Sequence, residues 1–465
     1  QVLKFHGRAR DLTQHSAVST ISSTPGRRMR ASMALPTVGG PYVWAFVAFT
    51  TAMHLLEEYL EVRQLRKNRE TRLPQELQGT VDEKKFLESQ AYQIDKRLFG
   101  FVRDTIAFVW DKVGLFILVP LCWQMAVSVF GEEAEYKTTL AWLFLQQWAD
   151  KPVSIPLQLY SNFVIEERHG FNKMTVSLFF ADLVKTELLT YFFGGLLIPL
   201  LIWIVHYFGS SFYIYLWAVC QALMLAMMWV YPNVIQPIFN KFETLKDDDL
   251  RQKIEDLAGE VNFPLTKLFQ IDGSTRSSHS NAYFFGFWKY KRIVLYDTLL
   301  HLKQEDILAI LCHELGHWKF GHTLVNLCIS SGHIFVLFWL FGAVMYSGDM
   351  SQDIVRQFGF GDTKAVMVSL MIFMNLFTPT EQVVSLLMTM LSRRFEFQAD
   401  SFAHKMGRSG PLQSGLMQIH EENKGDLNPD PWYSWYHFSH PPLVERIRAL
   451  KILEAAEGVA QKKEK

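Results

Sequence analysis

The chain has 465 residues, of which 49% are hydrophobic and 14% aromatic, including 37 phenylalanines, and this composition favours a membrane protein over a set of soluble domains. Lysine plus arginine equals aspartate plus glutamate at 46 each, and neither a Gly-rich phosphate loop nor zinc-finger spacing is present, so we expect no nucleic-acid partner. The four cysteines are scattered, three of them within apolar runs, which argues against a disulfide framework or a cysteine-based zinc site.

Residues 1–40 form the first segment along the chain. They are rich in serine and threonine and show no hydrophobic periodicity. We interpret them as a tail that is disordered or not native to the protein, and we assign it no function.

Seven apolar segments follow, each of about 20 residues and therefore long enough to cross a bilayer as a helix. They cover 42–60, 113–130, 138–159, 188–208, 212–231, 323–345 and 365–391. The run at 42–56 lacks the n-region and the cleavage pattern of a signal peptide, so we interpret it as an anchor. Pro379 should kink the last of the seven helices.

Basic residues beside these segments predict their orientation, because lysine and arginine collect on the cytosolic side. One side carries 61–72, 168–173, 232–322 and the tail after 391, whereas the other carries 131–137, 209–211 and the acidic-leaning 346–364. We therefore expect the first set to be cytosolic. The arginines of the N-terminal tail oppose this assignment, since an odd number of spans places that tail on the other side.

Three segments outside the apolar runs have their own character. We expect 61–112 to be charged and helical, 232–310 to mix helix and strand, and 392–465 to be helical. Within the second, "NAYFFGFWKYKRIVLYDTLL" (281–300) predicts a strand, a polar turn and a second strand, before a helix begins near Gln304.

The helix expected at "QEDILAILCHELGHW" (304–318) carries the sequence H-E-x-x-H. On a helix His313 and His317 share one face, and two imidazoles at this separation suit tetrahedral Zn²⁺ with a water in the open position. Glu314 lies near enough to take a proton from that water, whose pKa zinc lowers to about 7. Chance alone would produce this motif about once in a hundred chains of this length, so the neighbouring residues must decide.

A catalytic zinc ion needs a third protein ligand, and "RRFEFQAD" (393–400) offers one. Glu396 and Asp400 are four residues apart and so share a helix face. Glu396 could bind the metal while Asp400 holds a ligating imidazole through its other nitrogen. The alternative is a solvated charge pair that follows a membrane helix.

Three further polar residues were weighed for the same site. His322 lies five residues beyond His317, off the ligand face, and is expected to be structural or interfacial. His440 and Arg446 in "HFSHPPLVERI" are explained on sequence alone as the start of a helix after a Pro-Pro turn.

Taken in order, "VIEERHGFNKMT", "SHSNAYFFGF", "KRIVLYDTLL", "CHELGHW", "RRFEFQADSFA" and "HFSHPPLVERIRAL" on seven spans resemble the Ste-type CaaX prenyl proteases, from about residue 42 to the C-terminus. These are zinc metalloproteases of the endoplasmic reticulum and nuclear envelope. The resemblance implies an all-α polytopic membrane protein, a ring of seven helices around a water-filled chamber, with a zincin-type domain that carries a small β-hairpin.

The resemblance also assigns residues and a reaction. It implies zinc ligands His313, His317 and Glu396, with Glu314 as the base. Asn281 and Ala282 would bind the substrate backbone as an added strand, and His440 and Arg446 would steady the oxyanion and the active-site carboxylates. The substrate would be a prenylated CaaX protein that loses the three residues after its lipidated cysteine, with a second upstream cut in some members.

On this basis the chain divides into five parts. They are the tail 1–40, transmembrane helices 1–5 at 41–231 with a cytosolic loop at 61–112, a metalloprotease segment at 232–322, transmembrane helices 6 and 7 at 323–391, and a C-terminal metalloprotease segment at 392–465. The end "KKEK" (462–465) resembles a dilysine retrieval signal of the endoplasmic reticulum, which must face the cytosol.

Polar residues within or beside the apolar segments fit an internal chamber, because such groups normally face a protein interior or a water-filled cavity. Several of them could instead lie at helix ends and reach the interface. They are His54, Asp182, Lys185, Glu187, His206, Asn326, His333, Asn375 and Glu381.

Two other functions are weighed against prenyl-protein processing. A membrane quality-control protease that cuts misfolded or translocon-jammed proteins could use the same zinc site, and dependence on a prenyl group would separate the two. A seven-helix transporter or receptor with structural zinc is disfavoured, because structural sites have four protein ligands and this one has three plus a base.

Overall fold

The computed structural model describes residues 35–287 and 290–464, which belong to a unit that runs from Leu35 to the C-terminus. Most of the predicted tail 1–40 therefore lies outside the described residues. So does Lys465, the last residue of the predicted retrieval signal.

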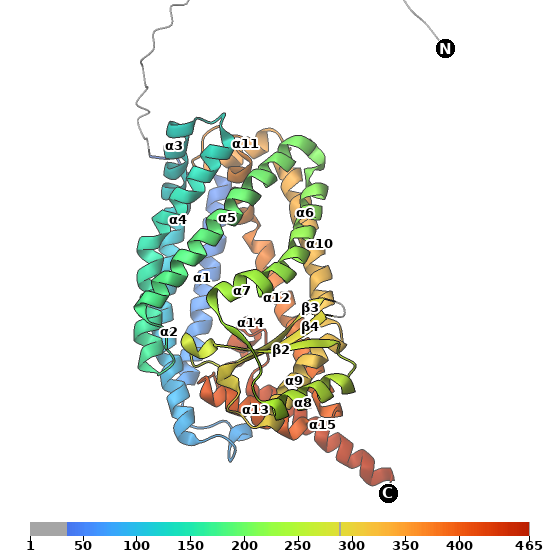
Figure 1. Cartoon of the computed structure of the whole chain (residues 1–465). Helices are drawn as coiled ribbons and strands as arrows, with labels where there is room; N and C mark the ends of the chain where they lie inside the picture. Colours follow the sequence, from blue (N-terminus) through green and yellow to red (C-terminus); the bar gives the residue numbers. More distant parts are fainter. Residues whose placement is uncertain (1–34, 288–289, 465) are drawn as a thin grey trace, which may run out of the picture. The chain divides into compact units, whose positions relative to one another are not determined.

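Long helices account for most of the described chain (Figure 1). The first group is α1 (Pro41–Asn68), α2 (Glu83–Val113), α3 (Val119–Phe130), α4 (Glu135–Tyr160), α5 (Val176–Phe208), α6 (Phe212–Val230) and α7 (Gln236–Phe239). The second is α8 (Asp248–Glu260), α9 (Gln304–Lys319), α10 (His322–Met345), α11 (Asp349–Gln357), α12 (Val366–Lys405), α13 (Ser409–Glu422), α14 (Pro431–His437) and α15 (Leu443–Glu464). Wider π turns join α2 to α3 (Gly114–Leu118), follow α4 (η3, Ser161–Glu166) and join α6 to α7 (Tyr231–Ile235).

All seven predicted apolar segments lie in helices, within α1, α2–α3, α4, α5, α6, α10 and α12. Four helical stretches are long and apolar enough to cross a membrane: Glu83–Phe130, Val176–Phe239, His322–Met345 and Val366–Lys405. The second of these holds two predicted spans, because the chain turns at Gly209 (φ 53°) between α5 and α6. The segments at 42–60 and 138–159 are helical but fall outside the four stretches, so the count of seven spans stays a prediction.

A small sheet lies between the membrane-type helices and the C-terminal helices. Its strands are β1 (Phe242–Thr244), β2 (Leu265–Ile271), β3 (Ala282–Phe287) and β4 (Tyr290–Tyr296), in the spatial order β1-β2-β4-β3. β2 and β4 are parallel, whereas β1 with β2 and β3 with β4 are antiparallel. The predicted hairpin at 281–300 and the helix start at Gln304 are both confirmed, and β3 lies at the edge of the sheet.

The hydrophobic core below the sheet is built by α8, α9, α13 and α15 together with β2 and β4. Its buried side chains include Ile254, Leu268, Ile293, Leu311 and Leu412. Burying one such side chain contributes about 1.5–3 kcal/mol, so this core fixes the helix that carries H-E-x-x-H.

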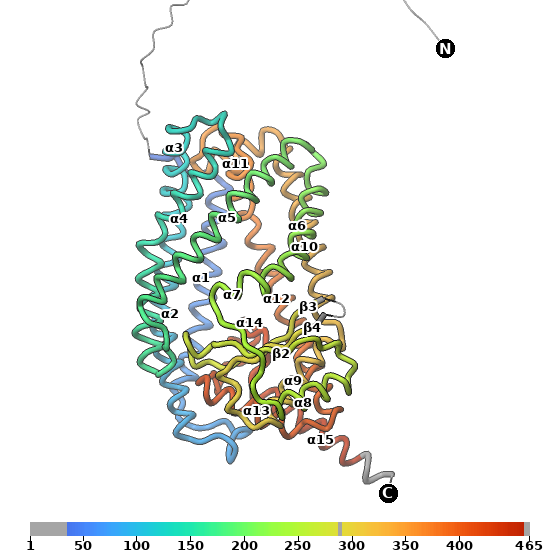
Figure 2. The backbone as a smooth tube through the Cα atoms, in the orientation of Figure 1, coloured from blue at the N-terminus to red at the C-terminus, as the bar shows by residue number. Residues whose placement is uncertain are grey.

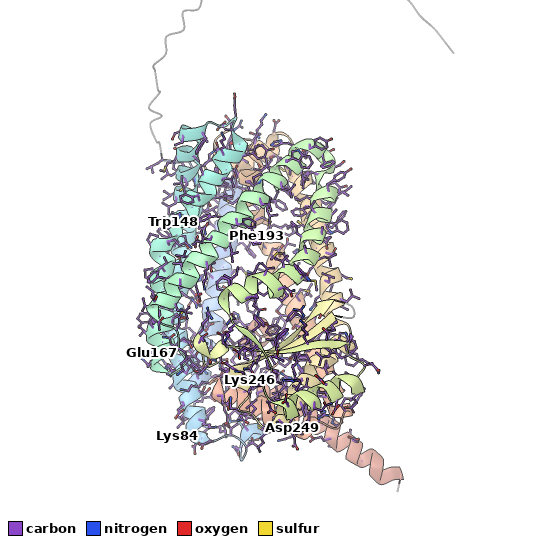
Figure 3. All side chains as sticks on the ribbon, viewed as in Figure 1. Lys84, Trp148, Glu167, Phe193, Lys246 and Asp249 are labelled. Carbon is purple, nitrogen blue, oxygen red and sulfur yellow. The ribbon has the colours of Figure 1, made fainter. Side chains whose placement is uncertain are left out.

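The tube in Figure 2 shows that α1, α4, α5, α6, α10 and α12 run alongside one another, with the sheet, α8, α9, α13 and α15 gathered toward the C-terminal end. Figure 3 shows the same division in side chains, since Trp148 and Phe193 lie along the helices and Lys84, Lys246 and Asp249 lie near the sheet end. The two parts are connected twice. α12 runs from one part into the other, through Pro379 to Lys405, and α9 leads through Gly321 into α10.

Candidate metal centre

The predicted ligands lie on α9 and α12 and meet where these helices cross. The Nε2 atoms of His313 and His317 are 3.2 Å apart. Carboxylate oxygens of Glu396 lie 3.4 Å from Nε2 of His313 and 3.2 Å from Nε2 of His317. One donor atom from each residue falls within 4.8 Å of the others, which brings together side chains far apart in the sequence.

Close approach of the two helices depends on the glycine inside H-E-L-G-H. A Cβ atom at Gly316 would lie 3.1 Å from the Cα atom of Ala399 and 3.2 Å from the side chain of Phe402. These distances are shorter than ordinary carbon contacts, so a side chain at residue 316 would require α12 to shift by a few tenths of an ångström, and glycine favours this close packing. The small side chain of Ala399, fully buried, completes the contact.

Asp400 lies one helical turn beyond Glu396 on α12 and contacts the ring nitrogen of His313 that faces away from Glu396. Its Oδ1 atom is 2.8 Å from Nδ1 of His313, which leaves Nε2 facing Glu396 and His317. Burial disfavours a charged imidazole here, but hydrogen bonds to Asp400 and Glu396 outweigh burial and raise the pKa of His313 to about 9.

Arg446, from α15, donates two hydrogen bonds to the carboxylate of Asp400. Nε donates to Oδ2 at 2.9 Å and Nη2 donates to Oδ1 at 2.6 Å. This bidentate geometry gives both strength and orientation. Nη1 also lies 3.4 Å from Oε2 of Glu396, so one buried guanidinium offsets the charge of two buried carboxylates.

His440 reaches the same cluster from the solvent side. Its Nδ1 atom is 3.0 Å from Oε1 of Glu396, while 70% of its side chain is exposed against 3% for Glu396. It precedes Pro441 and Pro442, after which α15 begins at Leu443. The same short segment therefore leads into the predicted helix and contacts Glu396.

Glu314, the predicted base, is half-buried on α9 next to His313. No hydrogen bond or ion pair joins its carboxylate to another residue of the described chain, so both of its oxygens can accept a proton. Asn281 and Ala282 stand at the start of the edge strand β3, which packs against α9. Asn281 Oδ1 accepts a hydrogen bond of 2.8 Å from the backbone N–H of Ala282.

His322 is the contact that the sequence did not reveal. Its Nδ1 atom lies 3.0 Å from Nδ1 of His317, its Nε2 atom lies 2.9 Å from Oε1 of Gln398, and its ring stacks on Phe395. Five residues along one helix would place His322 off the ligand face. Gly321, at φ 69°, lies between α9 and α10 and changes the direction of the chain, and the glycine itself was the signal that the sequence offered.

The residues fit a metal ion. Oε2 of Glu396 is buried and has no hydrogen-bond partner among the described residues. Its nearest cationic groups, Nε2 of His313 and Nη1 of Arg446, lie 3.4 Å away without forming a hydrogen bond, and a divalent cation between this oxygen and the two imidazoles would satisfy it. Two imidazole nitrogens and one carboxylate oxygen are a ligand set that suits zinc with one position left open.

Comparison with known proteins agrees with this geometry. The sequence profile of the CAAX prenyl protease N-terminal domain, described as five membrane helices, matches residues 62–241, and that of peptidase family M48 matches 244–454. A CAAX prenyl protease 1 homolog of Arabidopsis thaliana is 44% identical over 418 residues, covering 88% of this chain and 97% of the relative.

Two further relatives are a yeast protein and a crystal structure. CAAX prenyl protease 1 of Saccharomyces cerevisiae is 36% identical over 435 residues, covering 88% of this chain and 95% of the relative. The crystal structure of S. mikatae Ste24p superposes with a TM-score of 0.81 at 36% identity, covering 89% of this chain and 99% of that one.

Proposed function

The chain belongs to peptidase family M48, in the CAAX prenyl protease branch, and from this premise we propose that it is a zinc endopeptidase that removes the aaX tripeptide from prenylated CaaX proteins. The family makes it a membrane-embedded metalloendopeptidase that processes CAAX proteins. The metal's identity, the residue roles, the substrate details and the topology are the content of the proposal.

One observation carries the proposal: a buried oxygen of Glu396 that forms no hydrogen bond with the described residues and lies beside two imidazoles. His313, His317 and Glu396 would hold one zinc ion, which supplies Lewis acidity toward the scissile carbonyl and lowers the pKa of water. Glu314 would accept the proton of the attacking water and pass it to the leaving amine.

Asp400, Arg446 and His440 have supporting roles in this proposal. Asp400 fixes the ring of His313 through Nδ1, and Arg446 fixes Asp400. Because Nδ1 of His440 would donate to Glu396, its exposed ring could also donate from Nε2 to an oxyanion when the ring is an imidazolium. Arg446 is too deeply buried to touch substrate, so it acts through the carboxylates.

The substrate backbone would pair with the free edge of β3 at Asn281 and Ala282. The Ala282 N–H is capped by the side chain of Asn281 rather than by a strand neighbour, so a substrate carbonyl could replace that cap. This placement would lay an extended peptide beside α9, next to Glu314.

The prenyl group explains why the site adjoins apolar helices. α9 leads directly into α10, and α12 runs from an apolar stretch to Glu396, so a lipid chain in the bilayer lies near the peptide that it anchors. Seven spans around a water-filled chamber, location in the endoplasmic reticulum and a cytosolic active site complete the proposal. The basic segments at 61–72 and 168–173 support that orientation.

The test is cleavage of a farnesylated CaaX peptide beside its unprenylated twin by the detergent-purified protein, with bound zinc measured and Glu314→Gln as control. We expect cleavage after the prenylated cysteine, about one zinc per chain, and a silent variant that keeps its zinc. Equal cleavage of both peptides would favour quality-control proteolysis. An unaltered rate in Glu314→Gln would contradict the assignment of the base.

A further inference from the structure

The stretch "EERHGFNK" (166–173) has no role in the site described so far, although the structure ties it to the substrate strand. The helical segment after α4 ends here at Gly170, whose φ is 82°. Phe171 N–H donates to the carbonyl of Glu166 at 2.8 Å and Gly170 N–H donates to that of Glu167 at 3.0 Å, which is a Schellman ending. Glu167 marks this turn in Figure 3.

The turn aims Phe171 into the protein. Phe171 is 4% exposed, and its ring centroid lies 4.8 Å from that of Tyr92 on α2. On its other face it stacks on His279, with centroids 4.2 Å apart and an angle of 15° between the rings. His279 belongs to the segment that leads into β3, so an aromatic stack joins the end of a long helix to the start of the substrate strand.

Backbone contacts repeat the connection. Asn172 and Ser277 form an antiparallel bridge, and Ser278 N–H donates to the carbonyl of Phe171 at 3.2 Å. The segment before β3 is therefore held to the turn by main-chain hydrogen bonds as well as by side chains.

Glu166 adds contacts to Tyr92 and His279, one through each of its carboxylate oxygens. Oε1 accepts a hydrogen bond of 2.7 Å from the hydroxyl of Tyr92, and Oε2 lies 3.4 Å from Nε2 of His279. From the opposite side, Oδ1 of Asn423 accepts a hydrogen bond of 3.1 Å from Ser280 N–H. The chain is thus fixed from two directions immediately before Asn281.

We propose that Glu166, Phe171 and His279, together called the clamp, position the edge of β3 to receive the substrate backbone; this inference rests on the proposed role of Asn281 and Ala282. The clamp residues touch neither the metal ligands nor Glu314, so they are positioning residues. An edge strand held in place before binding spares the substrate the cost of ordering it.

Position of the strand affects binding more than chemistry, because the metal ligands lie on α9 and α12 instead. For Glu166→Gln, His279→Gln and the double variant we measure kcat and KM on the farnesylated peptide. Each single variant should raise KM about tenfold with kcat within about twofold. The double variant should resemble His279→Gln alone, since both changes remove the Glu166–His279 contact and only His279→Gln also removes the ring stack on Phe171 and the contact with Asn423.

His301→Gln is the matched control. Nε2 of His301 lies 2.7 Å from Oε2 of Glu422, a histidine–carboxylate pair of the same kind that is half-exposed and shares no residue with the clamp. This variant should leave KM unchanged. An unchanged KM in both clamp variants, or a loss confined to kcat, would overturn the proposal.

Hydrogen exchange gives a readout that needs no catalysis. Phe171→Leu keeps apolar volume but removes the ring stack. It should therefore speed amide exchange at 278–283 and leave exchange at 313–317 unchanged. Exchange at 278–283 that is as slow in the variant as in the wild type would overturn the proposal. If the wild-type protein cuts prenylated and unprenylated peptides equally, the substrate proposal fails alone, because KM for either peptide still reports the clamp.

Discussion

Two buried arginines in this protein hold buried carboxylates, and only one of the two clusters has an unmatched acceptor. Arg97 on α2 and Arg446 on α15 are 8% and 5% exposed. Arg97 binds Asp426, and Arg446 binds Asp400. Around Asp426 both carboxylate oxygens accept hydrogen bonds, whereas beside Asp400 an oxygen of Glu396 has no partner in the described chain.

The difference separates a structural connection from the proposed metal site. Every nitrogen of Arg97 donates: to Asn68 at 2.7 Å, Glu61 at 2.6 Å and Asp426 at 2.9 Å. These bonds join α1 and α2 to the segment before α14. A saturated cluster, in which the acceptors are all hydrogen-bonded, has no atom left to bind a ligand, whereas the unsaturated cluster at Glu396 has one unbonded oxygen. The number of unbonded acceptors therefore distinguishes the two clusters better than their residue types do.

The largest expected effect is on the saturated cluster. Arg97→Met leaves the carboxylates of Glu61 and Asp426 without their shared counter-charge, and breaking a buried pair in this way costs about 3–5 kcal/mol. Thermal unfolding in detergent should show the loss with or without added zinc. Arg103→Met is the control on the same helix, because the Arg103–Asp104 pair is exposed and should contribute under about 1 kcal/mol. Similar melting of both variants would contradict a structural role for Arg97.

The second effect belongs to the unsaturated cluster and depends on metal. Glu396→Gln removes the charge of a proposed ligand, while Arg446 keeps its two hydrogen bonds to Asp400, so the fold should survive while zinc no longer stabilises it. At a thousandfold excess over Kd, bound zinc adds about 4 kcal/mol of stability in the wild type, and the variant should lose that increment. Differential scanning fluorimetry with zinc and with chelator measures it. Glu445→Gln, which alters a partly exposed pair with Arg393, should keep the zinc response.

Sequence periodicity predicted which side chains lie together where they share one helix. His313, Glu314 and His317 share one helix, and Glu396 and Asp400 share another, so periodicity alone predicted which side chains face together. The hairpin and the start of α9 followed from turn residues and alternation. The Arg97 cluster has no such signature, because its members lie between Glu61 and Asp426 and only the packing of helices brings them together.

Other contacts escape the sequence for physical reasons of the same kind. Helical spacing predicts His322 to be structural or interfacial but does not predict its contact with His317, because a left-handed Gly321 resets the direction of the chain. The clamp joins 166–171 to 277–279 across the fold, and neither segment alone indicates the other. Residues 1–34 and Lys465 lie outside the described chain, so the predictions about the tail and the retrieval signal stay predictions.

A third prediction concerns His322, which supports a ligand without being one. His322→Phe keeps the stack on Phe395 but removes the contact with His317, and loss of such an outer partner costs about 10–100-fold in metal affinity. Competition with a zinc chelator dye measures the change. His333→Asn, farther along α10 and paired with Glu381, should leave zinc affinity unchanged. Equal affinities in wild type and His322→Phe would make His322 a packing residue only.

The smallest expected effect is a proton count, and it ties the charge of the unsaturated cluster to its function. His313 has a pKa of about 9 beside Asp400 and Glu396, so at pH 7.5 its ring carries a proton that must leave when Nε2 binds a metal. Zinc uptake at pH 7.5 should therefore release about one proton, and zinc affinity should fall about tenfold for each unit of acidification below pH 9. Titration calorimetry in two buffers of different ionisation enthalpy counts the protons. In Asp400→Asn the imidazolium loses one of its two carboxylate partners, so proton release should drop while Glu396 still binds. Unchanged proton release in this variant would mean that Asp400 orients the ring of His313 without setting its charge. Asp400 would then have a purely structural role, as Asp426 has beside Arg97.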